Sequence, residues 1–212
     1  MLINFGDIDD YTFFICLDCE FTCWENSNAL GWPDPDFPPE IIQIGLSVYD
    51  ILTFTVLDEF SSYVSPKVNT ALSEYCKDLL DINQENIDNA KLFSQLADSI
   101  DVFLNPYTPS RSLVCSFGPD CERIAADSRR QSFTDPLARY NKLDLRLEAA
   151  RILGYGNQSI YREFIYKDLD LPPCVGRHDA LSDALDLVRI VQALHNYQES
   201  CQTDPRNKAG YR

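Results

Sequence analysis

Two carboxylates close an apolar run near the N-terminus, and their spacing is the strongest chemical signal in the chain. Residues 13–17 are apolar, Asp18 follows them, and Glu20 comes two residues later. Because side chains alternate between the two faces of a strand, Asp18 and Glu20 are predicted to lie on the same face. Two carboxylates held this close repel each other unless one is protonated or a cation lies between them. The pair therefore predicts a cation site at the end of a strand.

Three further residues of suitable chemistry follow in two later segments. Asp120 comes after the apolar residues 113–115 through a Ser-Phe-Gly-Pro turn, and His178 precedes Asp183 by five residues. Acids from three segments together with one histidine suggest a phosphodiesterase site with two metal ions, which would activate water and stabilise the leaving oxygen. Oxygen ligands favour Mg²⁺ or Mn²⁺ over zinc.

Each of these residues taken alone also has a structural interpretation. Aspartate commonly opens helices, as Asp120 would do after Gly-Pro, and a single histidine such as His178 is more often a surface or capping residue. Asp183 alone would be an acid on a helix face. Asp179 lies closer to the predicted helix start and is the better candidate for capping that helix.

The order of these residues resembles that of the DEDDh exonucleases of the ribonuclease H-like superfamily. Within it, the run from Asp18 to Glu25 is similar to the Asp-x-Glu-x-Thr-Cys-x-Glu motif of the Eri-1-like 3′-to-5′ exoribonucleases. Residues 40–45, 63–76 and 80–90 are similar to later segments of that group, with Asp81 where glycine is usual. The resemblance extends from about residue 13 to residue 195.

The resemblance implies a role for each of the five residues. Asp18 would bridge both metal ions, and Glu20 and Asp183 would complete the site that holds the attacking water. Asp120 would act on the second ion, partly through water. His178 would accept the proton from the attacking water as general base, a task suited to a group that titrates near neutral pH.

The resemblance also implies a substrate. It predicts an exoribonuclease that hydrolyses single-stranded RNA 3′ ends to nucleoside 5′-monophosphates, and His178 would lie beside that RNA. Glu20 and the backbone of Phe21 would contact the terminal ribose, where a 2′-OH contact would favour RNA. Trp24 either stacks on a base or anchors the following loop. Two alternatives stay open: a DNA or mixed-specificity 3′-to-5′ exonuclease, and a non-catalytic interaction module.

Charge limits the kind of nucleic acid that the chain is expected to bind. The formal net charge is −15, the wrong sign for long-range attraction to a polyanion. A short single-stranded 3′ end remains compatible, because metal ions would supply the local positive charge. Arg123, Arg129 and Arg130 form the clearest basic cluster, which is either a solvated helix face or a phosphate contact. A protein partner is a further expectation, for target choice.

Composition favours a single globular domain in a reducing compartment. The chain has 212 residues with 45% hydrophobic content, and no apolar run approaches the roughly 20 residues that span a bilayer. The N-terminus is acidic rather than a basic signal sequence, so a cytoplasmic protein without membrane association is predicted. The eight cysteines lack paired spacing, which favours buried free thiols over disulfides or a zinc site.

The order of predicted elements indicates an α/β fold. Three strands form an antiparallel meander, and two shorter strands alternate with helices. The strands are predicted at residues 12–18, 41–49, 52–64, 111–115 and 143–145, and the longer helices at 71–80, 91–103, 120–132, 159–167 and 179–197. The resemblance implies the ribonuclease H-like fold: a central mixed five-stranded sheet flanked by helices, with the first and fourth strands adjacent. We expect an N-terminal extension at 1–11, the exonuclease domain at 12–197 and a polar tail at 198–212.

Overall fold

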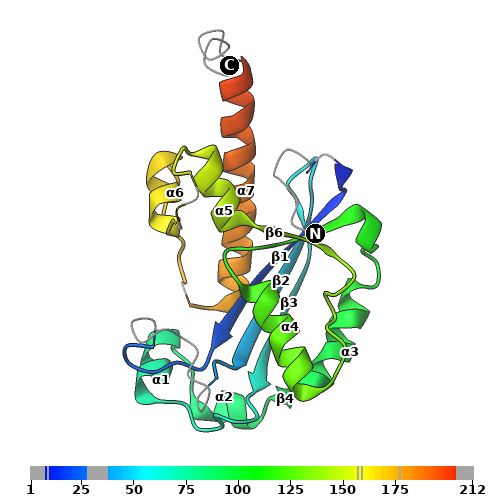
Figure 1. Cartoon of the computed structure of the whole chain (residues 1–212), viewed down its shortest axis with the longest axis vertical. Coiled ribbons are helices and arrows are strands. Elements are labelled where there is room, and N and C mark those ends of the chain that lie inside the picture. The colour runs from blue at the N-terminus through cyan, green and yellow to red at the C-terminus, as the bar shows by residue number, and fades with distance from the viewer. Residues whose placement is uncertain are drawn as a thin grey trace.

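A mixed six-stranded sheet forms the centre of the computed structural model, which describes residues 8, 10–27, 38–156, 158, 160–176 and 178–203 (Figure 1). The strand order across the sheet is β4-β3-β2-β1-β5-β6. The strands are β1 (Phe13–Phe21), β2 (Ile41–Asp50), β3 (Val56–Ser65), β4 (Lys91–Leu92), β5 (Ser112–Ser116) and β6 (Asn141–Asp144).

The pairing around β1 confirms the predicted neighbours. β1 pairs antiparallel with β2 and parallel with β5, which is the fourth strand that the sequence predicted. The sheet has one strand more than the five predicted, because β4 pairs with Val64 and Ser65 at the edge. Lys91 and Leu92, which form β4, were predicted to begin a helix, and the prediction was wrong there, since two residues are too few for an alternating pattern to show.

Seven α-helices surround the sheet in the described part of the chain. They are α1 (Glu74–Leu80), α2 (Gln84–Asp88), α3 (Phe93–Leu104), α4 (Asp120–Gln131), α5 (Leu145–Ile152), α6 (Arg162–Asp168) and α7 (Ala180–Thr203). The sequence did not predict α2, whose five residues are too short for helical periodicity. α7 was predicted to end at Tyr197 and instead continues to Thr203, projecting beyond the sheet (Figure 1). Most of the predicted loop from Trp24 to Pro39 lies outside the described residues.

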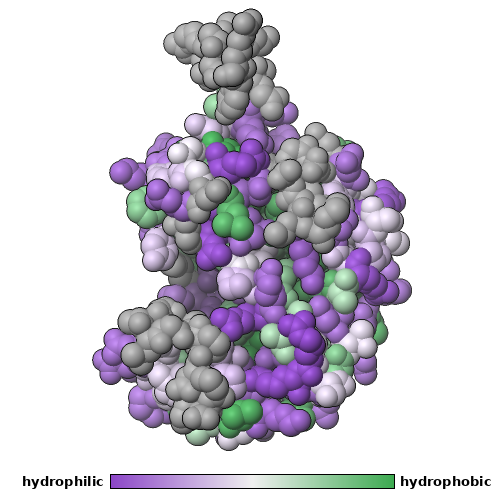
Figure 2. Space-filling model, in the orientation of Figure 1, coloured by the Kyte–Doolittle hydropathy of each residue, from purple (hydrophilic) through white to green (hydrophobic). Residues whose placement is uncertain are grey.

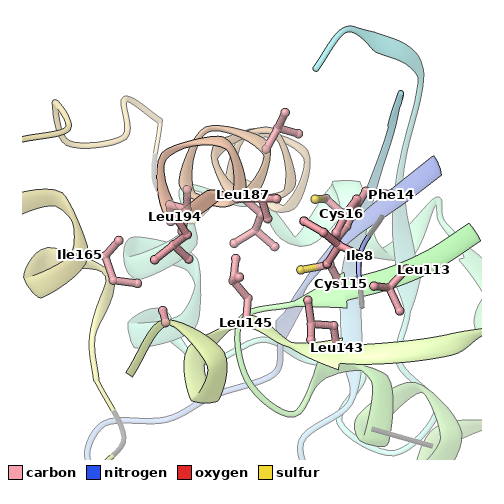
Figure 3. Close-up of a cluster of buried hydrophobic side chains, with 14 of the residues drawn as sticks. Ile8, Phe14, Cys16, Leu113, Cys115, Leu143, Leu145, Ile165, Leu187 and Leu194 are labelled. Atoms are coloured by element: carbon pink, nitrogen blue, oxygen red, sulfur yellow. The ribbon is translucent and has the colours of Figure 1, made fainter. Parts of the chain in front are cut away.

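Alternate side chains of β1 enter two different hydrophobic layers. Phe14 and Cys16 pack with residues of α5, α6 and α7, including Leu187 (Figure 3). Ile15 and Leu17 pack on the opposite face against α3 and α4. β1 is therefore buried on both faces, and the even-numbered positions that lead to Asp18 and Glu20 are those that face α7.

The eight cysteines are all free, as the sequence predicted. Cys16 and Cys19 point to opposite faces of β1 and enter different layers of the core, so they cannot share a metal ion. Among the helices that the structure describes, none combines the length and the apolar character that a membrane span requires.

Candidate active site

The sheet brings Asp18 and Glu20 next to the segment that carries Asp120. β1 and β5 run parallel, so their carboxyl ends lie at the same edge of the sheet, and the two acids stand at the end of β1. The chain leaves β5 through a tight turn in which Gly118 has a φ of +115°, a conformation that favours glycine. Asp120 then opens α4, which places its buried carboxylate beside the end of β1.

A close approach between α7 and β2 brings Asp183 to the same place. Gly45 of β2 is paired with Asp18 of β1, and a Cβ on Gly45 would lie 2.2 Å from the backbone carbonyl of Ala180. Only a glycine leaves room for the start of α7 to rest on the sheet there. The Gln43 side chain adds two hydrogen bonds, donating to Asp179 Oδ2 at 2.8 Å and accepting from the Ala180 backbone N–H at 3.3 Å.

Asp179 has the capping role that the sequence predicted for it. Its Oδ1 atom accepts a hydrogen bond from the Ser182 backbone N–H at 2.9 Å, which satisfies one of the free donors at the helix start. Asp183 lies one turn further along α7 and is only 6% exposed. The two acids therefore differ in their surroundings, although they lie four residues apart on one segment.

Three carboxylates converge at this edge of the sheet. Asp18, Glu20 and Asp183 each offer an oxygen within 4.8 Å of the others. Asp120 lines the same cavity, whose volume is about 340 Å³. In Figure 2 the surface is hollowed at the left, between the α6 side and the α1 side of the molecule, where these strand ends lie in Figure 1. The described residues that line the cavity are Asp18, Cys19, Glu20, Phe21, Pro39, Phe117, Pro119, Asp120, Arg123, Tyr161, Arg162, Glu163, His178 and Asp183.

The crowded acids hold protons more tightly than isolated carboxylates do. Burial, with the nearby Asp120 charge, raises the pKa of Asp18 well above its usual value. Burial and the Asp183 charge raise the pKa of Glu20 to about 8, and burial raises that of Asp120 to about 7. Burial is the largest cause of each shift, and the positive charge nearby is too small to offset it. The donor set of clustered carboxylate oxygens fits Mg²⁺ or Mn²⁺.

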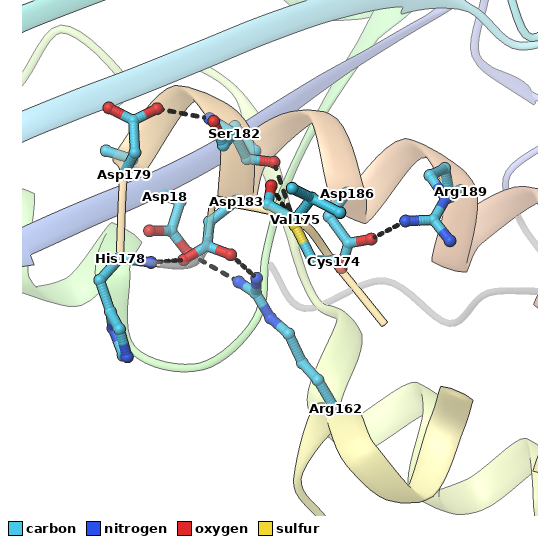
Figure 4. Close-up of polar contacts among 12 residues, drawn as sticks. Asp18, Arg162, Cys174, Val175, His178, Asp179, Ser182, Asp183, Asp186 and Arg189 are labelled. Carbon is cyan, nitrogen blue, oxygen red and sulfur yellow. Dashed lines mark hydrogen bonds and ion pairs between the residues drawn. The ribbon is translucent and has the colours of Figure 1, made fainter. Parts of the chain in front are cut away.

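A buried arginine donates hydrogen bonds to two of these acids, and no pattern in the sequence singled it out. The Arg162 guanidinium donates to Asp18 Oδ1 at 2.7 Å and to Asp183 Oδ1 at 2.6 Å (Figure 4). Its guanidinium carbon also lies 5.3 Å from the centre of the Phe117 ring. Arg162 is only 8% exposed although it is the first residue of a short helix. The candidate site thus contains a cation of its own.

His178 reaches the site through its backbone. Its N–H donates to Asp183 Oδ2 at 3.2 Å, and the residue lines the cavity. The imidazole ring points away from the carboxylates of Asp18 and Asp183 in Figure 4. The φ of His178 is +67°, an uncommon value for a residue other than glycine, and such strain is often found at functional sites.

Some of the other predicted binding residues line the cavity, and others make contacts elsewhere in the fold. Phe21 and Arg123 line the cavity, whereas Trp24 is not among the described lining residues. The Trp24 backbone N–H instead donates to Ser27 Oγ at 2.6 Å, within the following turn. Arg130 is bound to Glu40 and Asp127, so it is structural rather than a free phosphate contact. The sequence did not identify Tyr161, which lines the cavity and is 72% exposed.

The strand order and the acids at the end of β1 define an α/β fold of the ribonuclease H-like type. Two crystal structures of nucleases share it. The nuclease domain of 3′hExo, a DEDDh family member bound to rAMP, has a TM-score of 0.74 at 22% identity and covers 91% of this chain and 94% of that one. Cell-death related nuclease 4 (CRN-4) also has a TM-score of 0.74 at 22% identity and covers 88% and 64%.

The chain belongs to the exonuclease family RNase_T, whose model matches residues 15–191. It is 33% identical over 96 residues to the 3′-5′ exonuclease eri1 of Schizosaccharomyces pombe, covering 45% of this chain and 30% of that protein. It is 34% identical over 101 residues to the 3′-5′ exoribonuclease 1 of Homo sapiens, covering 47% and 27%. The matched part thus spans less than a third of each of these two relatives. The 3′-5′ exonuclease crn-4 of Caenorhabditis elegans is 27% identical over 184 residues, covering 76% and 58%.

Proposed function

We propose that this protein is a metal-dependent 3′-to-5′ exoribonuclease. The observation that carries the proposal is the convergence of Asp18, Glu20 and Asp183, whose oxygens lie within 4.8 Å of one another in a cavity that Asp120 also lines. Buried acids without enough internal positive charge are expected to bind divalent cations. Membership of the exonuclease family and the names of the relatives support phosphodiester hydrolysis as the reaction.

Four carboxylates would hold two divalent ions, Mg²⁺ or Mn²⁺. Asp18, Glu20 and Asp183 would hold one ion, and Asp18 and Asp120 would hold the other. The ions would lower the pKa of the attacking water and stabilise the charge on the leaving oxygen. Their charge would also offset the burial that raises the pKa of Asp18, Glu20 and Asp120, and the repulsion between acids that adds to it at Asp18 and Glu20.

We assign proton transfer to His178. The residue lines the cavity and is anchored to Asp183 through its backbone N–H, so only its side chain has to turn for the imidazole to face the attacking water. A histidine titrates near neutral pH and accepts a proton there at little cost. The strained φ of +67° is consistent with a backbone held in place for this purpose.

The substrate proposal is a single-stranded RNA 3′ end. The cavity, of about 340 Å³, is of the size that accommodates a small ligand rather than a duplex. Glu20 and the backbone of Phe21 would contact the terminal ribose, and Tyr161 offers an exposed ring on which a base can stack. A related structure is described as 3′-end specific recognition of histone mRNA stem-loop by 3′-exonuclease, which supports a 3′ end as the substrate.

A DNA or mixed-specificity exonuclease is the second candidate. The carboxylates act on the phosphate and do not distinguish the two sugars. The Caenorhabditis elegans relative is named only as a 3′-5′ exonuclease, without a preference for RNA. We further propose a protein partner for target choice and a cytoplasmic location, the latter because all eight cysteines are free.

Matched RNA and DNA oligonucleotides test this proposal. With Mn²⁺, 3′-labelled RNA should release labelled nucleoside 5′-monophosphate at once, and 5′-labelled RNA should shorten stepwise. A 3′-phosphate should inhibit, since the cavity must enclose the terminal sugar. Cleavage of circular RNA, or activity unchanged by a chelator, would contradict the proposal. Equal rates on DNA would favour the second candidate.

A further inference from the structure

Arg162 contacts two of the acids that a divalent ion at this site would need. Its two terminal nitrogens contact Oδ1 of Asp18 and Oδ1 of Asp183, two of the three acids whose oxygens converge. We propose that Arg162 is a built-in competitor of the metal ion: an ion binds Asp18 and Asp183 only when the guanidinium leaves them. This inference rests on the proposed function, because it assumes that these acids are metal ligands.

The geometry makes the two cations mutually exclusive. Mg²⁺ binds carboxylate oxygens at about 2.0 to 2.1 Å and requires near-octahedral geometry. The guanidinium nitrogens lie 2.7 Å from Asp18 Oδ1 and 2.6 Å from Asp183 Oδ1, with their N–H groups directed at these oxygens. An ion placed between the two oxygens would therefore clash with the guanidinium hydrogens. The arginine and the ion would also repel each other at this distance in a buried site.

The charges explain why the arginine is present and why it can leave. When Asp18, Glu20, Asp120 and Asp183 are all ionised, they carry more negative charge than one guanidinium neutralises. A divalent ion carries twice the charge of Arg162 and is the stronger partner for the acids. The cost of separating the guanidinium from Asp18 and Asp183 lowers the net affinity for the ion. Arg162 would therefore hold the acid cluster together without metal and set the ion concentration at which the site loads.

The contacts of Arg162 outside the acids are compatible with such a movement. The ring of Phe117, 5.3 Å from the guanidinium carbon, offers a cation–π contact that does not depend on Asp18 or Asp183. Arg162 is the first residue of α6, at the wall of the cavity next to the exposed Tyr161. Its side chain can thus reach the open part of the cavity through rotation about its own bonds.

Calorimetric titration of the full chain with Mn²⁺ alone, repeated with Ca²⁺, tests the competition. Arg162→Gln should bind Mn²⁺ about tenfold or more tightly than the wild type, because the ion no longer breaks two charge-assisted hydrogen bonds. Its melting temperature without metal should fall, and the increase on adding Mn²⁺ should be larger than in the wild type. Arg151→Gln is the charge-matched control: it removes an exposed arginine paired with Glu148 and should leave the affinity unchanged.

Arg162→Lys keeps the positive charge and provides a second variant in case Arg162→Gln does not fold. Lysine lacks the fork that binds both acids, so this variant should bind Mn²⁺ more tightly than the wild type but less tightly than Arg162→Gln. Mn²⁺ affinity that is equal or weaker in both folded Arg162 variants would overturn the inference. Asp18→Asn separates the two proposals. If Asp18→Asn weakens Mn²⁺ binding and the Arg162 variants do not strengthen it, only the competition is wrong; if Asp18→Asn binds Mn²⁺ as the wild type does, the proposed function fails.

Discussion

Two buried acid clusters in this molecule each contain an arginine, and they differ in how their carboxylates are satisfied. In the Glu40 cluster, Arg130 contacts Glu40 at 3.2 Å and Asp127 at 2.6 Å. Glu40 also accepts three backbone N–H groups, from residues 67–69, at 2.7 to 2.9 Å. Asp127 accepts the Ile41 backbone N–H at 3.3 Å. The fold itself thus supplies the donors that these acids need.

Backbone donors are fewer around Asp18, Glu20 and Asp183 at the end of β1, whereas Asp120 accepts from the backbone of Cys19 and from its own backbone. Among the described residues, Arg162 donates to Asp18 and Asp183, and the only backbone donor to Asp183 is the His178 N–H. Glu20 brings a third carboxylate to the same point and adds negative charge. Burial of an acid therefore does not by itself indicate function. The two clusters differ in whether donors of the fold complete the hydrogen bonding of the carboxylates or leave carboxylate oxygens for a bound cation.

Removing one acid from the β1 cluster should have the largest effect. Asp18→Asn should reduce nuclease activity to background and abolish high-affinity Mn²⁺ binding, because the proposed bridging ligand loses its charge. The protein should remain folded, as circular dichroism would verify. Calorimetry and the labelled-RNA assay measure the two effects, and retention of either one would contradict the assignment of Asp18.

Removing the proposed base should affect the rate and spare metal binding. His178→Ala should lower the rate by about 10² to 10⁴, the usual range for loss of a general base. Activity should recover in part at high pH, where hydroxide replaces the base. The other histidine of the chain provides the control, since His195 packs near Phe54, away from the acids, and His195→Ala should keep the wild-type rate. A pH–rate profile that is identical in His178→Ala and wild type would show that His178 is structural.

The Glu40 cluster should respond in the opposite way. Glu40→Gln should lower the free energy of unfolding by about 3 kcal/mol, because it leaves buried donors and Arg130 without their charged acceptor. Mn²⁺ affinity of the folded variant should stay the same. Urea unfolding and calorimetry test both statements together. If Glu40→Gln lost Mn²⁺ binding without losing stability, the two clusters would not differ in the way proposed.

The contact between β2 and α7 links stability to the site. Gly45→Ala should lower the free energy of unfolding by about 2 kcal/mol, since a Cβ 2.2 Å from the Ala180 carbonyl forces the helix away from the sheet. Moving α7 also moves Asp183 away from Asp18, so Mn²⁺ binding should weaken. Ala184→Gly, on the same helix, is the comparison, because it loosens α7 without pushing it off the sheet. Unchanged Mn²⁺ affinity in a folded Gly45→Ala protein would show that this contact does not position Asp183.

The stability of the metal-free protein should also depend on pH. Folding raises the pKa of Glu20 to about 8 and that of Asp120 to about 7, above the values of about 4 expected in the unfolded chain. Between about pH 4 and pH 8 the folded protein therefore binds more protons than the unfolded chain, so its free energy of unfolding falls as the pH rises. Glu20→Gln or added Mn²⁺ should flatten this decline. A metal-free melting temperature that rises over this range, or a decline that Glu20→Gln leaves unaltered, would contradict it.

Local patterns in the sequence predicted the acids well but not the cation between them. Alternation along β1 is enough to place Asp18 and Glu20 on one face, and the adjacency of β1 and β5 was expected from the family fold. Arg162 had no comparable signal, because its two partners lie 144 and 21 residues away along the chain. Gly45 was recognised only as part of a family motif. Its purpose depends on the backbone of α7, more than a hundred residues away, which no local pattern reveals.

Anomalous diffraction from crystals containing Mn²⁺ is the sharpest test of the metal site, because it locates bound ions without reference to activity. We expect an anomalous peak bound by Asp18, Glu20 and Asp183, and a second peak about 4 Å away on the side of Asp120. The Arg162 guanidinium should have left Asp18 and Asp183, and the Glu40 cluster should hold no ion. An ion at the Glu40 cluster, or Arg162 still bound to both acids with no peak beside them, would contradict the proposed metal site.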